Sequence, residues 1–376
     1  MKGVKKFSEE NRDEALRLLR ELCGIPAPSF FERARAEYCK AVLESYGAEG
    51  VYIDSVNNVV FPINCEGSDY ISVFAAHTDT VFPDREPYPF SEDEEKIYCP
   101  GVGDDTAGLV EILLMAKYFI EEGIRPRNGV IFLCNSCEEG LGNLVGIRAF
   151  MKEYGERVGR FVTLDSIEGR LTFMPVGSHR YRVTVKTEGG HSFQKFGNEN
   201  AIHELSKIIG EIYKIEVPKK EGSRTTYNVG NIEGGTSVNT IAQSASMLCE
   251  YRSDDRESLT YMRGEFDRIF RSAANERVRV EVEQIGDRPC KGIVDPEAEA
   301  RLVGICDRVY KRVSGKNLTY ILASTDANIP MSMGIPSVCI GNFEGGGAHT
   351  REEYLVKSSF SKQIEFCLGV AVELGE

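Results

Sequence analysis

An apolar run that ends abruptly in polar residues constrains the fold of this chain more than any other stretch. Ile71–Ala76 is apolar enough to be a buried strand, and His77-Thr78-Asp79 follows it directly. Two further runs, Gly129–Cys134 and Arg160–Leu164, have the same character and also lead into acidic residues. Such runs are typical of central strands in an α/β sheet that is covered on both faces. Because open α/β sheets bind ligands at the carboxyl ends of their strands, we expect a site at that edge.

The stretch after the first run carries two adjacent acids behind glycines. Gly101-Val102-Gly103-Asp104-Asp105 precedes an apolar helical segment, Leu109–Phe119. Taken alone, the acid pair is an N-cap that complements the helix dipole. A phosphate-binding loop is a second interpretation, but it is disfavoured because the acids would repel phosphate and no lysine follows them.

Polar residues at the expected strand ends form one candidate site. They are His77, Asp79, Asp104, Asp105, Glu138, Glu139, Asp165 and His349. Taken singly, a His-x-Asp is most simply a hydrogen-bonded pair, and an adjacent Glu pair is most simply solvated surface. Their joint occurrence at successive strand ends is different, because crowded carboxylates repel one another unless cations neutralise them. Imidazole and carboxylate ligands suit divalent ions, so the pattern predicts a two-metal hydrolytic site.

The periodicity of the sequence changes after Pro175. Strand-like and helix-like segments then follow in the order βαββαβ, from Arg180–Thr187 to Val278–Ile285. This order is typical of a ferredoxin-like sandwich, an antiparallel sheet with helices on one face. The α/β pattern then resumes. We therefore predict an α/β domain with a mixed sheet, residues 1–176 and 287–376, and an inserted α+β domain, residues 177–286.

Two helices near the chain ends are also expected. The first covers Ser8–Leu22, because apolar residues recur at helical spacing behind a serine that can act as an N-cap. The second runs from Glu353 to the end of the chain.

The charge balance excludes several classes of partner. Lys and Arg number 45 and Asp and Glu 58, which gives a formal net charge of -13 and argues against nucleic acid and anionic membranes. All apolar runs are shorter than a membrane span, and residues 1–22 lack the apolar region of a signal peptide, so we expect a cytoplasmic protein. The 11 cysteines are odd in number and include no C-x-x-C pair, which fits a reducing compartment.

Five short motifs resemble those of one family of hydrolases. They are His77-Thr78-Asp79, Gly103-Asp104-Asp105-Thr106-Ala107-Gly108, Cys137-Glu138-Glu139-Gly140, Leu164-Asp165 and Gly347-Ala348-His349-Thr350. In this order they resemble the metal-site motifs of the co-catalytic zinc exopeptidases and amidohydrolases. That family includes peptidase T, dipeptidase V, glutamate carboxypeptidase, acetylornithine deacetylase and succinyl-diaminopimelate desuccinylase. Ser324-Thr325-Asp326-Ala327 is most similar to the peptidase T branch, whereas Thr106 stands where many relatives have a lysine.

The resemblance implies a role for each motif residue. Five residues would hold two zinc ions: His77 and Asp165 one ion, Glu139 and His349 the other, and Asp104 both. Cobalt or manganese would also suit these ligands. Asp79 would orient the His77 imidazole, and Glu138 would be the general base. The Asp104–Asp105 peptide is cis in the family.

The inserted domain carries three further candidates by the same resemblance. His191, in Gly189-Gly190-His191-Ser192, would help to stabilise the oxyanion, Asn239 would contact the substrate, and Arg252 would bind a substrate carboxylate. From the residues alone, a turn histidine and a surface ion pair of Arg252 with Asp254 or Asp255 are the simpler interpretations.

The resemblance therefore implies a metal-dependent hydrolase that cleaves the amide bond of a di- or tripeptide. Deacylation of N-acyl amino acids by the same centre is an alternative. A non-catalytic module that lost the chemistry is another, but the full ligand set argues against it. A cysteine nucleophile at Cys137 is disfavoured because no histidine lies nearby in the sequence. A homodimer through the inserted lid domain is also expected.

Overall fold

The chain folds into two compact units. The structure, a computed structural model, describes residues 2–375. Unit 1 is formed by the chain up to Pro175 and from Gly292 onward, and unit 2 by Val176–Lys291.

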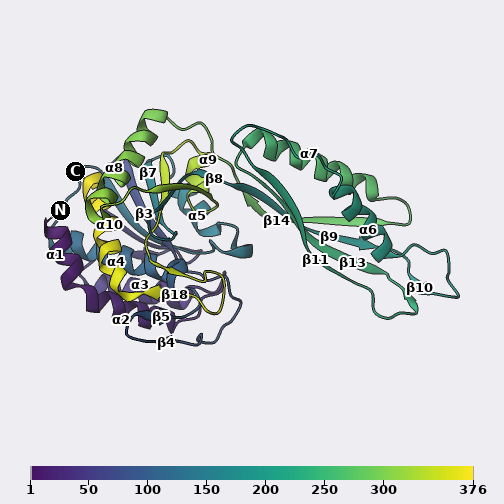
Figure 1. Ribbon diagram of the computed structural model, residues 1–376, viewed down its shortest axis with the longest axis horizontal. Coiled ribbons are helices and arrows are strands. Elements are labelled where there is room, and N and C mark those ends of the chain that lie inside the picture. The colour runs from purple at the N-terminus through teal and green to yellow at the C-terminus, as the bar shows by residue number, and fades with distance from the viewer. Residues whose placement is uncertain (1, 376) are drawn as a thin grey trace. The chain divides into compact units, whose positions relative to one another are not determined.

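Unit 1 is built around an eight-stranded mixed sheet in the order β1-β2-β6-β3-β7-β16-β8-β15 (Figure 1). The central strands β6, β3, β7 and β16 run parallel to one another, whereas β2 and β8 run antiparallel to their neighbours in the centre. The strands are β1 (Tyr52–Ile53), β2 (Val59–Ile63), β3 (Ile71–His77), β6 (Gly129–Asn135), β7 (Val158–Leu164), β8 (Arg170–Pro175), β15 (Thr319–Ala323) and β16 (Ser337–Ile340).

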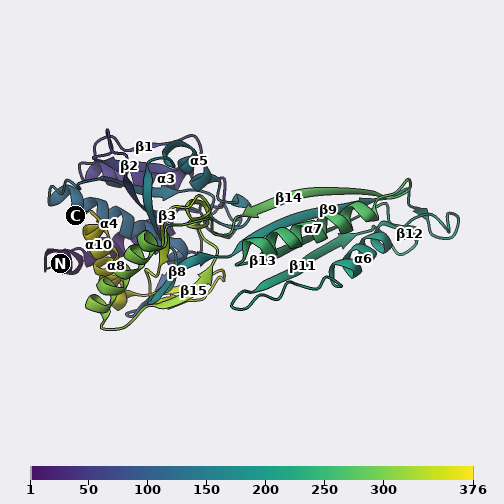
Figure 2. The same ribbon diagram turned by 90° about the horizontal axis from the view of Figure 1, so that it is seen from above.

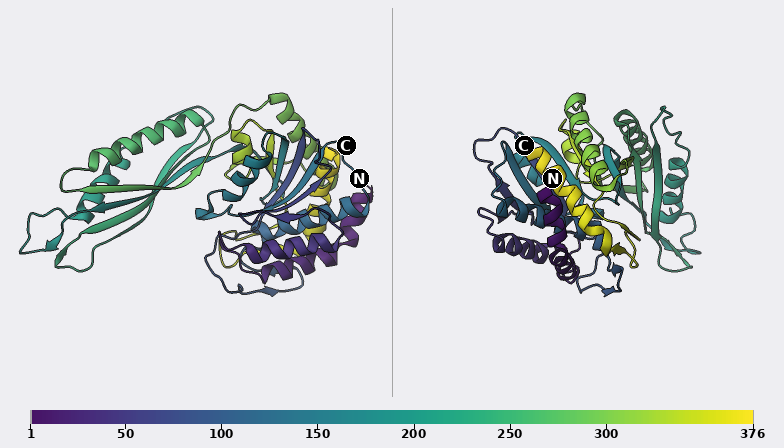
Figure 3. Two further views of the ribbon diagram at one scale, coloured as in Figure 1. Left: turned by 180° about the vertical axis from the view of Figure 1, so that it is seen from behind. Right: turned by 60° about the vertical axis from the view of Figure 1, so that its left-hand side comes forward.

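Helices cover both faces of this sheet, as the continuous apolar strands require. Phe74 and Ala76 of β3 pack into a core with α1, α2, α3, α4, α8 and α10, whereas Val73 and Ala75 pack into a second core with α5 and α9. Figure 3 shows the amino-terminal helices (purple) and α10 (yellow) against the first face. The helices are α1 (Lys2–Glu10), α2 (Arg12–Cys23), α3 (Arg33–Ser45), α4 (Gly108–Glu121), α5 (Val145–Tyr154), α8 (Pro296–Ser314), α9 (Asn328–Ser332) and α10 (Lys357–Gly375).

The first helix differs from the one expected at Ser8–Leu22. The structure has two helices there, which meet at Asn11. Ser8 lies inside α1, where its hydroxyl donates to Lys5 O at 2.9 Å instead of capping a helix. Val4 and Phe7 are buried in the first core, so packing extends the helical chain upstream of the expected start.

A small second sheet in unit 1 also corrects the sequence analysis. Its order is β17-β18-β5-β4, and Tyr354–Val356 (β18) pairs with Lys96–Tyr98 (β5). The last helix therefore begins at Lys357 and not at Glu353. The other two strands are β4 (Ser91–Glu92) and β17 (Gly345–Gly346). This pairing of distant segments fixes the loop that carries His349.

Unit 2 has the predicted βαββαβ order. Its antiparallel sheet has the order β11-β13-β9-β14, and α6 and α7 pack on one face (Figure 2). The elements are β9 (Gly177–Lys186), α6 (Ala201–Ile212), β11 (Thr225–Gly234), β13 (Ser244–Ser253), α7 (Arg256–Ala273) and β14 (Arg279–Arg288), with a short pair β10 (Gly190–His191) and β12 (Thr240–Ile241). The α/β fold with a mixed sheet and an inserted α+β part is confirmed.

Two features of the whole chain complete the description. All eleven cysteines are free and buried. Among residues 2–375, no helix combines the length and the apolar character that crossing a membrane would need.

Candidate metal centre

Three neighbouring strands deliver polar side chains to one edge of the sheet of unit 1. His77 is the last residue of β3, Glu138 and Glu139 follow β6, and Asp165 follows β7. Because β6 and β7 flank β3 and run parallel to it, their carboxyl ends meet at this edge. Most side chains within the strands are apolar and pack into the two cores, so the acidic and imidazole groups of the site stand where the strands end.

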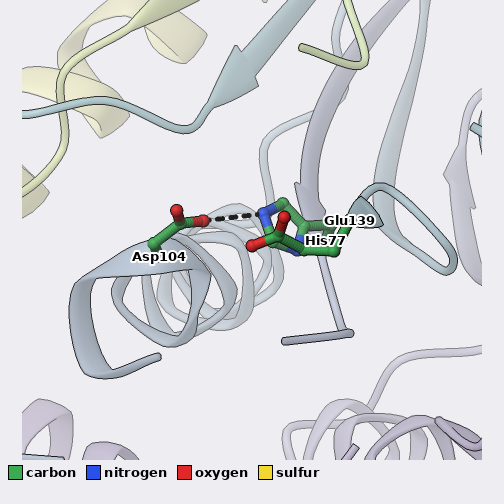
Figure 4. Close-up of side chains that lie close together, drawn as sticks. All are labelled: His77, Asp104 and Glu139. Atoms are coloured by element: carbon green, nitrogen blue, oxygen red, sulfur yellow. Dashed lines mark hydrogen bonds and ion pairs between the residues drawn. The ribbon is translucent and has the colours of Figure 1, made fainter. Parts of the chain in front are cut away.

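Asp104 lies between two imidazoles. Its Oδ1 is 3.0 Å from His77 Nε2, and its Oδ2 is 3.1 Å from His349 Nε2. His77, Asp104 and Glu139 offer ligand atoms that all lie within 4.8 Å of one another, and Figure 4 shows His77 facing Asp104 with Glu139 beside it. His349 Nε2 is also 3.4 Å from Glu139 Oε1. A carboxylate with one oxygen toward each imidazole has the geometry to bridge two ions.

The backbone around Asp104 gives the two adjacent acids different surroundings. In the irregular helical turn η1 (Val102–Ala107), Asp104 (φ -106°, ψ 92°) and Asp105 depart from helical geometry, and the peptide between them is cis. Asp105 accepts hydrogen bonds from His77 N at 3.0 Å and from Gly108 N at 3.2 Å. Asp105 therefore holds the end of β3 and the start of α4. Of the two acids that the sequence suggested as a helix cap, only Asp105 accepts from the first N–H of α4.

Asp79 fixes the loop that carries the two glutamates. Its Oδ1 accepts from Glu138 N and its Oδ2 from Glu139 N, both at 2.9 Å, while Ser29 Oγ donates to Oδ2 at 2.6 Å. His77 Nδ1 lies 3.0 Å from Asp79 O and 3.4 Å from Asp79 Oδ1. Burial opposes the charge of this carboxylate, but the hydrogen bonds from His77 and Ser29 outweigh it and hold its pKa below the usual range. Asp79 thus connects β3 with the loop after β6.

The clustered carboxylates have perturbed proton affinities. Burial, reinforced by the charges of Asp104 and Glu138, raises the pKa of Glu139 to about 7. Burial and the charge of Asp104 also raise the pKa of Asp165 well above its usual range. Hydrogen bonds to Asp104 and Glu139 raise the pKa of His349 to about 10. Perturbations of this kind are typical of carboxylates that share one site without a compensating cation.

The donor set fits divalent cations. Glu139 Oε1 is buried, and its contact with His349 Nε2, at 3.4 Å, is too long to be a well-formed hydrogen bond. Imidazole nitrogens and carboxylate oxygens are the ligands that zinc, cobalt and manganese accept. A cation here would satisfy this oxygen and relieve the repulsion that raises the proton affinities of Glu139 and Asp165.

Glu353 is a member of the site that sequence reasoning missed. Its carboxylate is buried and accepts from Gly101 N at 2.6 Å, Gly103 N at 2.9 Å and Asp104 N at 2.9 Å. Gly101 has a φ of 76°, in the left-handed region that suits glycine. No local sequence pattern distinguishes Glu353 from its exposed neighbour Glu352. Glu353 therefore fixes the backbone that presents Asp104.

A second missed group lies in the loop before α3. Glu32 is buried, and its Oε1 accepts from Phe30 N at 2.8 Å and from Cys137 N at 3.1 Å. Burial and the Glu32 charge raise the pKa of the Cys137 thiol, so this cysteine lacks the properties of a nucleophile. The sequence of the Pro-rich loop before Glu32 does not indicate that Glu32 contacts Cys137, which is distant in the chain.

Asp326, in the stretch most similar to peptidase T, is fully buried behind the sheet edge. Its Oδ2 accepts from Asn135 Nδ2 at 2.7 Å, and Asn135 is the last residue of β6. Burial and the charge of Glu138 raise the pKa of Asp326 to about 7. Asp326 therefore supports the strand end from which Glu138 and Glu139 follow.

The candidates of unit 2 have hydrogen-bond partners close to them in the sequence. His191 is exposed, and its Nδ1 accepts from Phe193 N at 3.3 Å. Asn239 is exposed and accepts from Ser237 Oγ at 2.9 Å. Arg252 forms a two-pronged ion pair with Glu250, at 2.8 and 3.0 Å, and not with the aspartates considered from the sequence.

Residues 73–373 match the profile of peptidase family M20/M25/M40. The chain belongs to this family. The matched stretch contains all five expected metal ligands and Glu138, and membership makes the chain a hydrolytic metallopeptidase. The family resemblance of the motifs is thereby confirmed.

Individual relatives of this M20 peptidase share its length at low identity. Succinyl-diaminopimelate desuccinylase of Corynebacterium glutamicum is 25% identical over 346 residues, 89% of this chain and 90% of that protein. Aminopeptidase PepT of Bacillus cereus is 22% identical, with a TM-score of 0.74 over 97% of this chain and 99% of its own. The YXEP protein of Bacillus subtilis, a dinuclear metal binding peptidase from the M20 family, is 15% identical with a TM-score of 0.65 over 97% and 99%. These structures share the fold of this chain.

Proposed function

We propose that this M20 peptidase hydrolyses the amide bond of short peptides, di- or tripeptides, at a centre of two zinc ions. His77 and Asp165 would hold one ion, Glu139 and His349 the other, and Asp104 would bridge them. The observation that carries this proposal is the Asp104 carboxylate, whose two oxygens lie 3.0 and 3.1 Å from separate imidazoles. When bound, such ions polarise the scissile carbonyl and acidify water.

Glu138 is the proposed general base. It takes a proton from the attacking water and returns it to the leaving amine. Its backbone is fixed by the hydrogen bond from its N–H to Asp79 Oδ1, and its side chain is only 5% exposed. Its charge contributes to the raised pKa values of Glu139 and Asp165, which supports a position close to both.

Three residues of unit 2 complete the proposal by family resemblance. His191 would donate to the oxygen of the scissile carbonyl as negative charge develops on it. Asn239 and Arg252 would bind the substrate, the latter through a carboxylate. Arg252 would have to exchange its ion pair with Glu250 for that contact.

Replacing Glu138 tests its role as general base, because this residue is not among the proposed metal ligands. We expect Glu138→Ala to retain the metal content of the wild type and to lose about 10²–10⁴-fold in turnover of short peptides, because the proton acceptor is gone. Glu122→Ala, an exposed glutamate after α4, is the matched control and should leave turnover unchanged. Normal turnover by Glu138→Ala would refute the role of Glu138.

Deacylation of N-acyl amino acids is the second candidate function. It is favoured by the likeness to the desuccinylase, which covers 90% of that protein. A panel of di- and tripeptides assayed beside N-acetyl and N-succinyl amino acids separates the two. Turnover of the acyl amino acids alone would replace the peptidase proposal.

A further inference from the structure

Large apolar side chains are exposed on the loops that surround the metal centre of unit 1. Phe30 is 56% exposed, Leu141 55% and Val81 36%. Leu141 comes two residues after Glu139, and Val81 two residues after Asp79. We refer to Phe30, Val81 and Leu141 as the apolar rim. Apolar side chains exposed on loops beside a polar site are available to bind an apolar part of a ligand.

Hydrogen bonds fix the loop of Phe30 against the centre. Its neighbour Ser29 donates from Oγ to Asp79 Oδ2 at 2.6 Å and to Glu139 O at 3.2 Å. The same loop pairs with the segment after β3, since Thr80 N donates to Ala27 O at 2.9 Å. The three rim residues therefore lie on loops that Ser29 and Thr80 hold together.

The backbone of Phe30 is in a conformation that aromatic residues rarely adopt. Its φ is 73°, in the left-handed region that a bulky side chain occupies only at a cost. Glu32 Oε1 holds it there by accepting from Phe30 N at 2.8 Å, and Phe31 N donates to Pro28 O at 2.8 Å. The side chain of Phe30 is therefore held in an exposed position beside the loop of Glu138 and Glu139.

We propose that the apolar rim binds an apolar side chain of the peptide next to the scissile bond. This inference rests on the proposed peptide hydrolysis and names its substrate class: peptides with a large aliphatic or aromatic residue at the cleaved bond. Burying such a side chain on Phe30 and Leu141 removes apolar surface from water.

Matched tripeptides test the rim. Gly-Gly-Gly, Leu-Gly-Gly and Gly-Leu-Gly would be assayed for kcat/KM with the wild type, Phe30→Ala and Leu141→Ala, each with its metal content measured. We expect the wild type to cleave at least one leucine peptide at least about tenfold more efficiently than Gly-Gly-Gly. Each rim variant should lower the ratio of kcat/KM for that leucine peptide to kcat/KM for Gly-Gly-Gly several-fold. A loss of this size is roughly what removing one or two methylene contacts from an apolar site causes. Tyr70→Ala is the control, because Tyr70 is an exposed aromatic residue (39%) at the other end of β3.

The outcomes separate the rim from the proposed function. Equal kcat/KM for all three peptides in the wild type would refute binding of an apolar substrate side chain by the rim. A preference for leucine that is unchanged in both rim variants would refute it as well. Peptide hydrolysis itself would stand in both cases. Cleavage of N-acyl amino acids but of none of the three peptides would overturn the proposed function and the rim with it. A loss of preference in Tyr70→Ala equal to that in Phe30→Ala would also contradict the rim.

Discussion

Adjacent acidic residues of this M20 peptidase differ in their surroundings because the backbone turns them apart. Asp104 faces two imidazoles, whereas Asp105 accepts from backbone N–H groups of β3 and α4. In the same way Glu353 is buried under the Asp104 loop while Glu352 is exposed. The residue type therefore indicates that a carboxylate is present, and the local backbone determines which of two neighbouring carboxylates faces the site.

Replacing Glu353 tests whether the backbone that presents Asp104 matters for metal binding. In Glu353→Gln, one carboxylate oxygen becomes an NH2 group that cannot accept, so either the hydrogen bond from Gly101 N or the two from Gly103 N and Asp104 N are lost. We expect zinc affinity to fall by about 10–100-fold, as for other partners that orient ligands. Isothermal titration of the metal-free protein with zinc measures it.

The matched control for this change is Glu352→Gln, at an exposed position one residue earlier. It makes the same Glu-to-Gln change in the same loop and should leave zinc affinity unchanged. Equal losses in both variants would mean that charge, and not the hydrogen bonds to the loop, matters.

Four of the candidate residues could be located from the sequence because they stand at or just after the end of an apolar run. His77, Glu138, Glu139 and Asp165 follow from that rule, and the structure brings their strands to one edge. Glu353 and Glu32 could not be found, because their partners are backbone N–H groups of segments distant in the chain. The sequence carries no pattern for such contacts.

At the scale of elements, helix α4 carries a buried acid with no role in the proposed chemistry. Glu111 is fully buried, and neither oxygen accepts a hydrogen bond within good geometry from a described residue. Burial raises its pKa well above the usual value, so the folded state favours the neutral acid. An unfolded glutamate ionises with a pKa of about 4.3. Folded-state stability from this group is therefore present below that pH and is lost as pH rises toward the folded pKa.

Glu111→Leu should stabilise the protein, and more so at higher pH. The leucine avoids burying a polar group without a hydrogen bond, which costs about 1–3 kcal/mol. We expect the thermal midpoint of the variant to exceed that of the wild type by more at pH 8 than at pH 5. Glu122→Leu, at an exposed position, should show no such dependence. A gain that is equal at both pH values would contradict the account of Glu111.

Elements formed by local pattern were predicted better than those that depend on distant partners. The apolar strands β3, β6 and β7 and the βαββαβ order of unit 2 follow from periodicity. The helix expected from Glu353 was wrong at its start, because Tyr354–Val356 pairs with Lys96–Tyr98. The helix expected at Ser8–Leu22 is present from Arg12 but was wrong at its start, because burial of Val4 and Phe7 extends helical structure upstream.

At the scale of the whole molecule, unit 2 has a core of its own. Its buried residues come only from its sheet, α6, α7 and adjoining segments, and include Val183, Met247, Met262 and Phe266. We expect a fragment of residues 176–291 to fold alone, with a cooperative thermal transition that chelators do not shift. Circular dichroism measures this. A fragment without a cooperative transition would mean that unit 2 depends on unit 1.

The homodimer through the inserted domain and the cytoplasmic location stay predictions. A mass from light scattering of twice 41.9 kDa for the full chain is the result expected for the dimer. The choice of zinc over cobalt or manganese likewise stays a prediction.

The most direct test of the two-metal centre bridged by Asp104 is the metal content of Asp104→Ala beside the wild type. We predict two zinc ions per chain in the wild type and loss of both in the variant, because one carboxylate faces both imidazoles. Elemental analysis of the dialysed proteins at matched concentration gives the numbers. Two ions retained by Asp104→Ala, or one site left at full occupancy, would contradict the bridge.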